Sequence, residues 1–362
     1  MTIINYQKAL NFFKEDKIKE LSESALGLRF LKLRSLSRTP IMKKFAMALK
    51  LDIENIPAKK LLEYLYNSEI QNDQIEELIR KFHSLERKDR INKERNLINE
   101  LYNLKIFDWG GLHQNSLEKT IINNYVKKVV SYKDLSKNID NKLYPSMKSY
   151  VLCSWYNHWS SIIIEDIFKD NKNVLPAIGL IKKIDFFIKD IPFDLKVTYL
   201  PEGFIKYKRK LSSLKPELTI LKKFCRDNSI NINKSLNDAR LLEDLWKKVK
   251  DFPDNKAKKL LNKIFSFRKK IIHDCYKNPK ELVIWLYENQ GVRRFDASNR
   301  LFLILIDTKD FFASWELKRA KPLLQKTINN YLNNNKKVGF KIEFNWEDQK
   351  YKSIADVIFV LR

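Results

Sequence analysis

Glycine and proline are scarce in this chain. Only 7 glycines and 10 prolines occur among 362 residues, and a turn-rich all-β fold would need more of both. The scarcity therefore favours helices. Hydrophobic residues make up 44% and aromatic residues 12% of the sequence, which is enough to bury a sizeable core and argues against wholesale disorder. A chain of this length is expected to form two or three domains, or one core with large insertions.

Cysteine is equally sparse, and several site signatures are missing. The three cysteines are widely spaced and contain no CxxC pair, so neither a disulfide framework nor a zinc knuckle is indicated. The four histidines are isolated from one another and from the cysteines, which also argues against zinc. No glycine-rich phosphate loop occurs, so ATP hydrolysis is not expected.

Long apolar runs are missing too. The N-terminus MTIINYQKAL lacks the apolar stretch of a signal peptide. The run LFLILI (301–306) is far too short to cross a bilayer. We therefore expect a soluble cytoplasmic protein in a reducing compartment, without membrane association.

Positive charge is what the chain has in excess. Seventy Lys and Arg stand against 44 Asp and Glu, for a formal net charge of +26. Self-repulsion on this scale weakens a compact state, so a polyanionic partner, and nucleic acid first, explains it best. The alternatives are an acidic membrane or protein surface, and a lysine-rich composition without a specific partner.

Patterns along the chain predict two regions. Residues 1–107 have helical periodicity and many basic residues, and form a possible DNA-binding domain or a bundle with a solvated basic face. The Gly-Gly pair in DWGGLHQNSLEK marks a boundary, after which 108–362 form the second domain. There the order is helix, strand pair, basic helical insertion at about 206–276, strand, helix and strands. That order indicates an α/β core.

The stretch KKIDFFIKDIPFDLKVTYLP (182–201) is unusual because carboxylates interrupt its apolar runs. Alternation along a strand puts every second residue from Phe193 on one apolar face and leaves Asp194 and Lys196 on the other. The same alternation in 184–188 leaves Asp185 opposite an apolar face. Each strand therefore has one apolar face and one face that bears charge.

A two-residue loop at Lys189 and Asp190 would pair 188 with 191, 186 with 193, and Asp185 with Asp194. The two aspartates would then face each other with Cβ atoms roughly 4.5–5.5 Å apart. Lys-Asp is a poor type I′ loop, so a longer turn and a slipped register are the alternative.

Like charges directly opposite each other destabilise a purely structural hairpin. A divalent cation reverses this, because Mg²⁺ takes oxygen ligands and tolerates one or two carboxylates plus waters. The ammonium of Lys196 returns to the same face and could orient a metal-bound water. The pattern therefore favours a Mg²⁺ site on the hairpin.

With these residues, IDFFIKDIPFDLK resembles the active-site hairpin of the PD-(D/E)XK nuclease superfamily, which includes many restriction endonucleases. The resemblance implies that Asp185 and Asp194 are the metal-binding acids and that Lys196 acts on the attacking water. Glu165 in IIIEDIF matches the acidic residue on the first core helix, with Asp166 the less favoured choice. The chain departs from the family in having Ile184 where many members have proline. The family's first core strand must also fit into the short segment 174–183.

The resemblance implies a restriction-endonuclease-like mixed sheet flanked by helices, with a helical N-terminal domain and a basic helical insertion. It also implies a Mg²⁺-dependent endonuclease that cuts double-stranded DNA, in a bacterial type II restriction or related defence system. Such enzymes often dimerise or work beside a methyltransferase subunit. The alternatives are a non-catalytic nucleic-acid-binding subunit and a structure-specific or RNA-directed nuclease. Candidate DNA contacts are the basic residues beside the hairpin and in the polar loop before the strand at 300: Lys182, Lys183, Arg293, Arg294 and Arg300.

Overall fold

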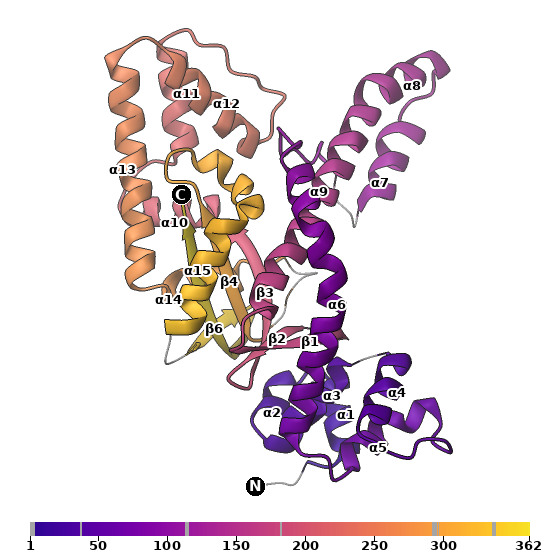
Figure 1. Ribbon diagram of the computed structural model, residues 1–362. Coiled ribbons are helices and arrows are strands. Elements are labelled where there is room, and N and C mark those ends of the chain that lie inside the picture. The colour runs from indigo at the N-terminus through magenta and orange to yellow at the C-terminus, as the bar shows by residue number, and fades with distance from the viewer. Residues whose placement is uncertain are drawn as a thin grey trace.

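A six-stranded mixed sheet forms the centre of the protein (Figure 1). The structure is a computed structural model that describes residues 4–36, 38–112, 116–181, 183–291, 295, 297–334 and 338–362. The strand order is β1-β2-β3-β4-β6-β5. The first three strands run antiparallel, β3, β4 and β6 run parallel, and β5 is antiparallel to β6. The strand bounds are β1 Val174–Ile181, β2 Ile184–Ile188, β3 Ile191–Tyr199, β4 Arg300–Ile306, β5 Phe340–Trp346 and β6 Gln349–Leu361.

Helices precede, interrupt and flank the sheet, as the scarcity of glycine and proline predicts. The N-terminal helices are α1 Tyr6–Lys14, α2 Ile18–Ser22, α3 Ala25–Ser35, α4 Thr39–Ala48, η1 Ala58–Lys60, α5 Leu61–Asn67 and α6 Asn72–Leu101. Before the sheet come α7 Leu117–Ile121, η3 Ile122–Val126, α8 Tyr132–Asn138, η4 Ile139–Leu143 and α9 Tyr144–Lys169. Between β3 and β4 lie α10 Glu202–Leu211, α11 Glu217–Asp227, α12 Asp238–Asp251, α13 Asn255–Lys277 and α14 Lys280–Glu288. After β4 come η6 Phe311–Arg319 and α15 Lys321–Asn334.

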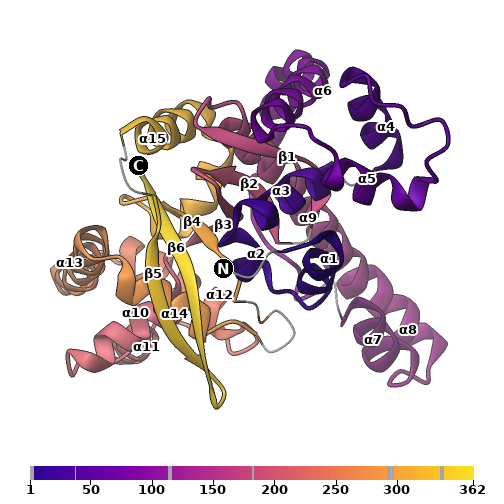
Figure 2. The same cartoon turned by 90° about the horizontal axis from the view of Figure 1, so that it is seen from below.

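The two faces of the sheet pack against different helices. Phe193 and Leu195 of β3 point to the face that α9 and α15 cover, together with alternate residues of β4 and β6. On the other face, Phe302 and Ile304 of β4 pack under α10, α13 and α14. Figure 2 shows these helix groups on opposite sides of the strands. The prediction of an α/β protein with a mixed sheet flanked by helices is therefore confirmed.

The hairpin between β2 and β3 has the predicted two-residue loop. Phe186 pairs with Phe193, Phe187 with Pro192, and Ile188 with Ile191. Lys189 and Asp190 have φ of 48° and 64°, the left-handed region that a type I′ loop requires at both positions. Asp190 also accepts a hydrogen bond from the Lys32 ammonium at 2.6 Å. This tertiary contact helps to hold a loop that the Lys-Asp pair alone favours poorly.

The N-terminal helices pack on the β1–β2 end of the sheet (Figure 1). Their apolar core includes Leu175 of β1 and Phe187 of β2. Arg80 of α6 donates a hydrogen bond to the carbonyl of Val174 in edge strand β1 at 2.6 Å. The helices therefore cover one edge of the sheet and contact the hairpin directly.

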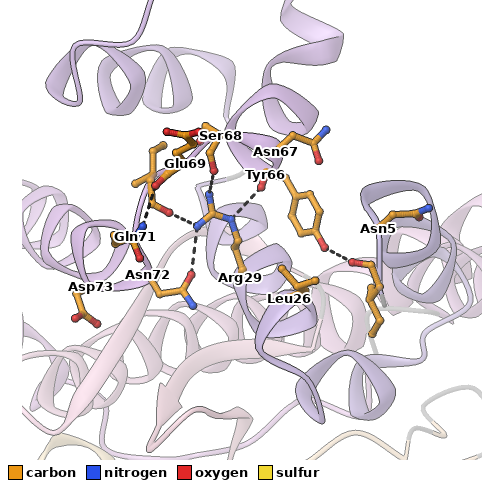
Figure 3. A pocket seen from close by; sticks show the side chains of 12 residues that line it. Asn5, Leu26, Arg29, Tyr66, Asn67, Ser68, Glu69, Gln71, Asn72 and Asp73 are labelled. Carbon is orange, nitrogen blue, oxygen red and sulfur yellow. Dashed lines mark hydrogen bonds between the residues drawn. The ribbon is translucent and has the colours of Figure 1, made fainter. Parts of the chain in front are cut away.

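A hollow of about 580 Å³ among the N-terminal helices surrounds Arg29 (Figure 3). A guanidinium has five N–H donors, and this one makes five hydrogen bonds. Its acceptors are the carbonyls of Leu65, Tyr66, Ser68 and Ile70 and the side-chain oxygen of Asn72. Arg29 therefore holds the segment between α5 and α6 and has no donor left for a phosphate.

The other edge of the sheet is β5, whose side chains alternate between buried and exposed positions. Its exposed Glu343 lies between two lysines of β6 and pairs with Lys350 at 2.6 Å and Lys352 at 3.2 Å. Charge thus lies along the outer strand pair.

Charged residues join α6 to α9 in a partly buried network. Asp166 of α9 accepts two hydrogen bonds from Arg90, at 2.8 and 2.9 Å, and lies 3.5 Å from Arg87. Arg87 also pairs with Asp170 and Glu94. Asp166 therefore has a structural role in this network.

His83, 7% exposed, lies beside this network on α6. Burial lowers the pKa of its imidazole to about 4, and the neighbouring cationic side chains act in the same direction against the opposing charge of Asp166.

We expect His83→Leu to flatten the pH dependence of the free energy of unfolding between about pH 6.5 and pH 4. In this window the unfolded chain protonates His83 and the folded chain does not, so stability falls as the pH falls, by roughly 2 kcal/mol. Urea unfolding at several pH values measures the slope. The matched variant His158→Leu, at an exposed histidine of α9, should leave the slope unchanged. An unaltered slope in His83→Leu would contradict the assignment.

Candidate active site

The two predicted aspartates come from adjacent strands of the hairpin. The ladder between β2 and β3 ends at the pair Phe186 and Phe193. Asp185 and Asp194 were expected to form the next pair, but they are not part of the ladder. Instead the Asp185 carboxylate accepts a hydrogen bond from the backbone N–H of Leu195 at 2.7 Å. That bond brings Asp185 to the residue next to Asp194. The strands therefore place both carboxylates in one region by a route that the simple register did not predict.

Asp185 is the most perturbed carboxyl group of the region. Burial, together with the negative charges of Glu165 and Asp194, raises its pKa to about 6 against the opposing effects of the Leu195 amide and Lys169. Within the described chain, no lysine or arginine forms an ion pair with Asp185. A carboxyl group held among other carboxylates without a cation of its own is suited to bind a positively charged ligand.

Asp194 has its charge compensated by two cations. Lys196, two residues further on the same face of β3, places its ammonium 2.8 Å from the Asp194 carboxylate oxygens. Arg300, the first residue of β4, lies with its Nε 3.5 Å from Asp194 on the other side. The Lys196 side chain is 46% exposed whereas that of Asp194 is 11% exposed. Lys196 is thus the member of the group that solvent and a large substrate can reach.

Glu165 reaches the same region from α9. Its carboxylate pairs with Lys169 one turn later at 3.1 Å, and its side chain is 33% exposed. Its charge acts on Asp185. Helix α9 and the hairpin therefore bring the four predicted residues Glu165, Asp185, Asp194 and Lys196 into one neighbourhood.

The predicted DNA contacts have different placements. Lys182, Arg293 and Arg294 lie outside the described residues. Lys183 lies between β1 and β2 with φ of 66° and pairs with Asp16 of the N-terminal helices at 3.2 Å. Arg300 was predicted in a polar loop before the strand, but it begins β4 and is only 6% exposed. Its guanidinium lies 5.0 Å from the ring of Tyr287 and 3.5 Å from Asp194 at Nε, so it is a buried neighbour of Asp194.

Two partners of the site were missed by sequence reasoning. Lys169 follows Glu165 by one helical turn, a spacing that predicts such a pair. Arg300 is opposite Asp194 because β3 and β4 are parallel and pair Asp194 with Arg300. A pairing between strands separated by a long helical insertion leaves no local signal in the sequence.

The donor chemistry suits a hard divalent cation. Carboxylate oxygens are the ligands that Mg²⁺ prefers, and Asp185 and Asp194 supply them from neighbouring positions. Among the described residues, no group of three or more His, Cys, Asp and Glu side chains is arranged to hold a metal ion. The fit therefore rests on the two aspartates.

Comparison with known protein families, with curated proteins and with solved structures found no match to this chain. None of the helices that the structure describes has the length and apolar character needed to cross a bilayer.

Proposed function

We propose that the protein is a Mg²⁺-dependent endonuclease of the PD-(D/E)XK superfamily that hydrolyses phosphodiester bonds of double-stranded DNA. The observation that carries the proposal is the meeting of Asp185, Asp194 and Lys196 on one hairpin, with the charge of Glu165 acting on Asp185 from the preceding helix. A purely structural hairpin gains nothing from two carboxylates whose charges act on each other.

The order of the elements supports the same proposal. Helix α9 leads into the antiparallel strands β1, β2 and β3, and after the insertion helices β4 returns parallel to β3. The core of the PD-(D/E)XK superfamily has the order helix, three strands, helix, strand, and the elements from α9 to β4 are compatible with it. The eight-residue β1 fills the short segment where the first core strand was expected.

The roles of the residues follow from their positions. Asp185 and Asp194 would hold the metal ion, with Glu165 assisting, and Arg300 keeps Asp194 in place as a positioning residue. When bound, Mg²⁺ lowers the pKa of a coordinated water and offsets negative charge on the phosphate. Lys196, exposed at its ammonium end, would orient the attacking water and stabilise charge that develops on the phosphate.

The net charge supports an anionic polymer as the substrate. A charge of +26 provides affinity for phosphate backbones that does not depend on sequence and weakens as salt is added. Discrete recognition of bases would select the cleavage positions. A restriction or defence role, alone or beside a methyltransferase subunit, is part of the proposal.

Incubation of supercoiled plasmid and unmethylated phage DNA with the purified protein tests the proposal. We expect discrete fragments with Mg²⁺, none with excess EDTA, and recovery of cleavage when Mg²⁺ is restored. The reason is that Asp185 and Asp194 would act by holding the Mg²⁺ on which hydrolysis depends. A smear of fragments would support nuclease activity but not cleavage at specific sites. DNA binding without cleavage in any divalent metal would replace the proposal with a non-catalytic binding subunit. Preferential cleavage of RNA or branched DNA would redefine the substrate.

A further inference from the structure

A second hollow, of about 680 Å³, lies between α10, α14 and the segment that follows α10. Its volume falls within the range of small-molecule sites. Its walls combine lysines with aromatic rings, and no carboxylate occurs among the described residues that line it. The six lining residues that matter here are Gly203, Lys206, Tyr207, Lys210, Lys215 and Trp285. We call this set the α10–α14 pocket.

Helical spacing gathers the α10 side of the pocket. Gly203, Lys206, Tyr207 and Lys210 recur at intervals of three and four residues, so they share one face of α10. A neighbouring lysine, Lys208, points elsewhere and pairs with Glu281 of α14 at 2.8 Å. In the described chain, by contrast, none of the three pocket lysines forms an ion pair. The charge of Lys206 acts on the Glu202 carboxylate one helical turn earlier, but within the described chain no ion pair holds any of the three ammonium groups away from an anionic ligand.

The aromatic side of the pocket depends on a glycine. A Cβ at position 203 would lie 2.9 Å from two carbons of the Trp285 ring, closer than packed atoms tolerate. Glycine at this position therefore lets the indole lie directly against α10. Tyr207 contributes a second ring and is 39% exposed. Two aromatic rings and three ammonium groups thus line one hollow.

We propose that the α10–α14 pocket binds an unpaired nucleotide of a single-stranded nucleic acid, with the base against Trp285 and Tyr207 and the phosphates at the lysines. A base paired within a duplex cannot enter a hollow of this kind, whereas an unpaired base exposes its ring to aromatic side chains. Phosphates beside the base match the three ammonium groups. The inference rests on the proposed function only in taking nucleic acid as the ligand.

Fluorescence anisotropy tests the pocket with the full chain, in EDTA so that no cleavage can occur. The probe is a labelled single-stranded 12-mer of thymidine. Trp285→Ala and Tyr207→Ala are each expected to weaken binding roughly tenfold to a hundredfold, whereas Trp285→Phe, which keeps a ring, should retain most of it. Gly203→Ala should also weaken binding by displacing Trp285. If Trp285→Ala does not fold, Tyr207→Ala carries the test because its ring is at the surface.

Charge reversals separate the pocket from general electrostatics. Lys206→Glu/Lys210→Glu/Lys215→Glu should lower the slope of log affinity against log salt by about 2, for three lost phosphate contacts on a single strand. The control Lys258→Glu/Lys259→Glu/Lys263→Glu makes the same change in net charge on exposed residues of α13 and should weaken binding much less. Equal losses in the two triple variants would overturn the proposal, as would wild-type affinity in both aromatic variants.

Two further measurements distinguish nucleotide binding at the pocket from simple anion binding and from the proposed nuclease activity. A labelled oligoglutamate of the same charge should bind far more weakly than the 12-mer, and equal affinity would reduce the pocket to a simple anion site. Plasmid cleavage with Mg²⁺ is measured on the same variants. If the pocket variants lose 12-mer binding and the wild-type protein does not cut DNA, the pocket proposal stands and the proposed nuclease activity does not. If the pocket variants keep 12-mer binding and the wild-type protein cuts DNA, the proposed nuclease activity stands and the pocket proposal does not.

Discussion

Asp194→Asn and Lys196→Ala are each expected to reduce plasmid cleavage by on the order of a thousandfold. Under the proposed function Asp194 would hold the metal ion, which would supply several kcal/mol of charge stabilisation in the transition state, where each 1.36 kcal/mol is tenfold in rate. Under the same proposal Lys196 would orient the attacking water, and loss of such a group costs roughly 10²- to 10⁴-fold. Initial rates of supercoil loss at saturating Mg²⁺ measure the effect.

The controls for this experiment come from the same hairpin. Asp190→Asn changes the loop carboxylate that contacts Lys32 and should leave the cleavage rate unchanged. Because Asp194→Asn removes the negative charge beside the buried Arg300, circular dichroism and a melting temperature must show that the variant is folded. Cleavage at the wild-type rate by a folded Asp194→Asn or Lys196→Ala variant would place the active site elsewhere in the molecule.

Arg268→Met is expected to lower the free energy of unfolding by about 3–5 kcal/mol, the usual cost of breaking a buried ion pair. Arg268, 2% exposed, joins α13 to α10 and α11 through Glu202 and Glu217, at 2.8 and 2.6 Å. It also lies 5.1 Å from the ring of Phe311. Without Arg268, the buried Glu217 loses its closest cation. Urea unfolding monitored by circular dichroism gives the difference.

The double variant Arg268→Met/Glu217→Leu is the matched test of that reason. When both charges are replaced by apolar side chains of similar volume, stability is often preserved or increased. Glu202 keeps its charge but is 38% exposed, and the buried Arg209 loses Glu217 at 3.8 Å, so we expect the double variant to recover part of the loss. A double variant as unstable as Arg268→Met would show that packing of the arginine, and not the abandoned charge, causes the effect.

The strands and long helices could be predicted because each carries its own periodicity. Alternation fixes β2 and β3, continuous apolar residues fix β4, and the two-residue loop follows from the positions of Ile188 and Ile191. The grouping of Asp185, Asp194 and Lys196 on the hairpin required only these local patterns. Glu165 was identified by the resemblance to the PD-(D/E)XK superfamily, which places an acidic residue on the helix before the hairpin.

The remaining features depend on contacts between distant segments. The hydrogen bond from Leu195 to Asp185, the support of Asp194 by Arg300, and the ion pair between Lys32 and Asp190 all require the folded sheet. The α10–α14 pocket needs two helices that are separated by the rest of the insertion. No periodicity reports how such segments meet, so the sequence alone could not predict them.

The two margins of the sheet limit how the protein can assemble. An uncovered outermost strand presents free backbone groups to which another chain can add. At β1 the helix α6 covers this margin, and Arg80 occupies the carbonyl of Val174. At β5 the margin is lined by Glu343 and its lysine partners on β6, and charges of this kind oppose the docking of a foreign strand. A second copy of the chain would therefore associate through helices rather than by extending the sheet.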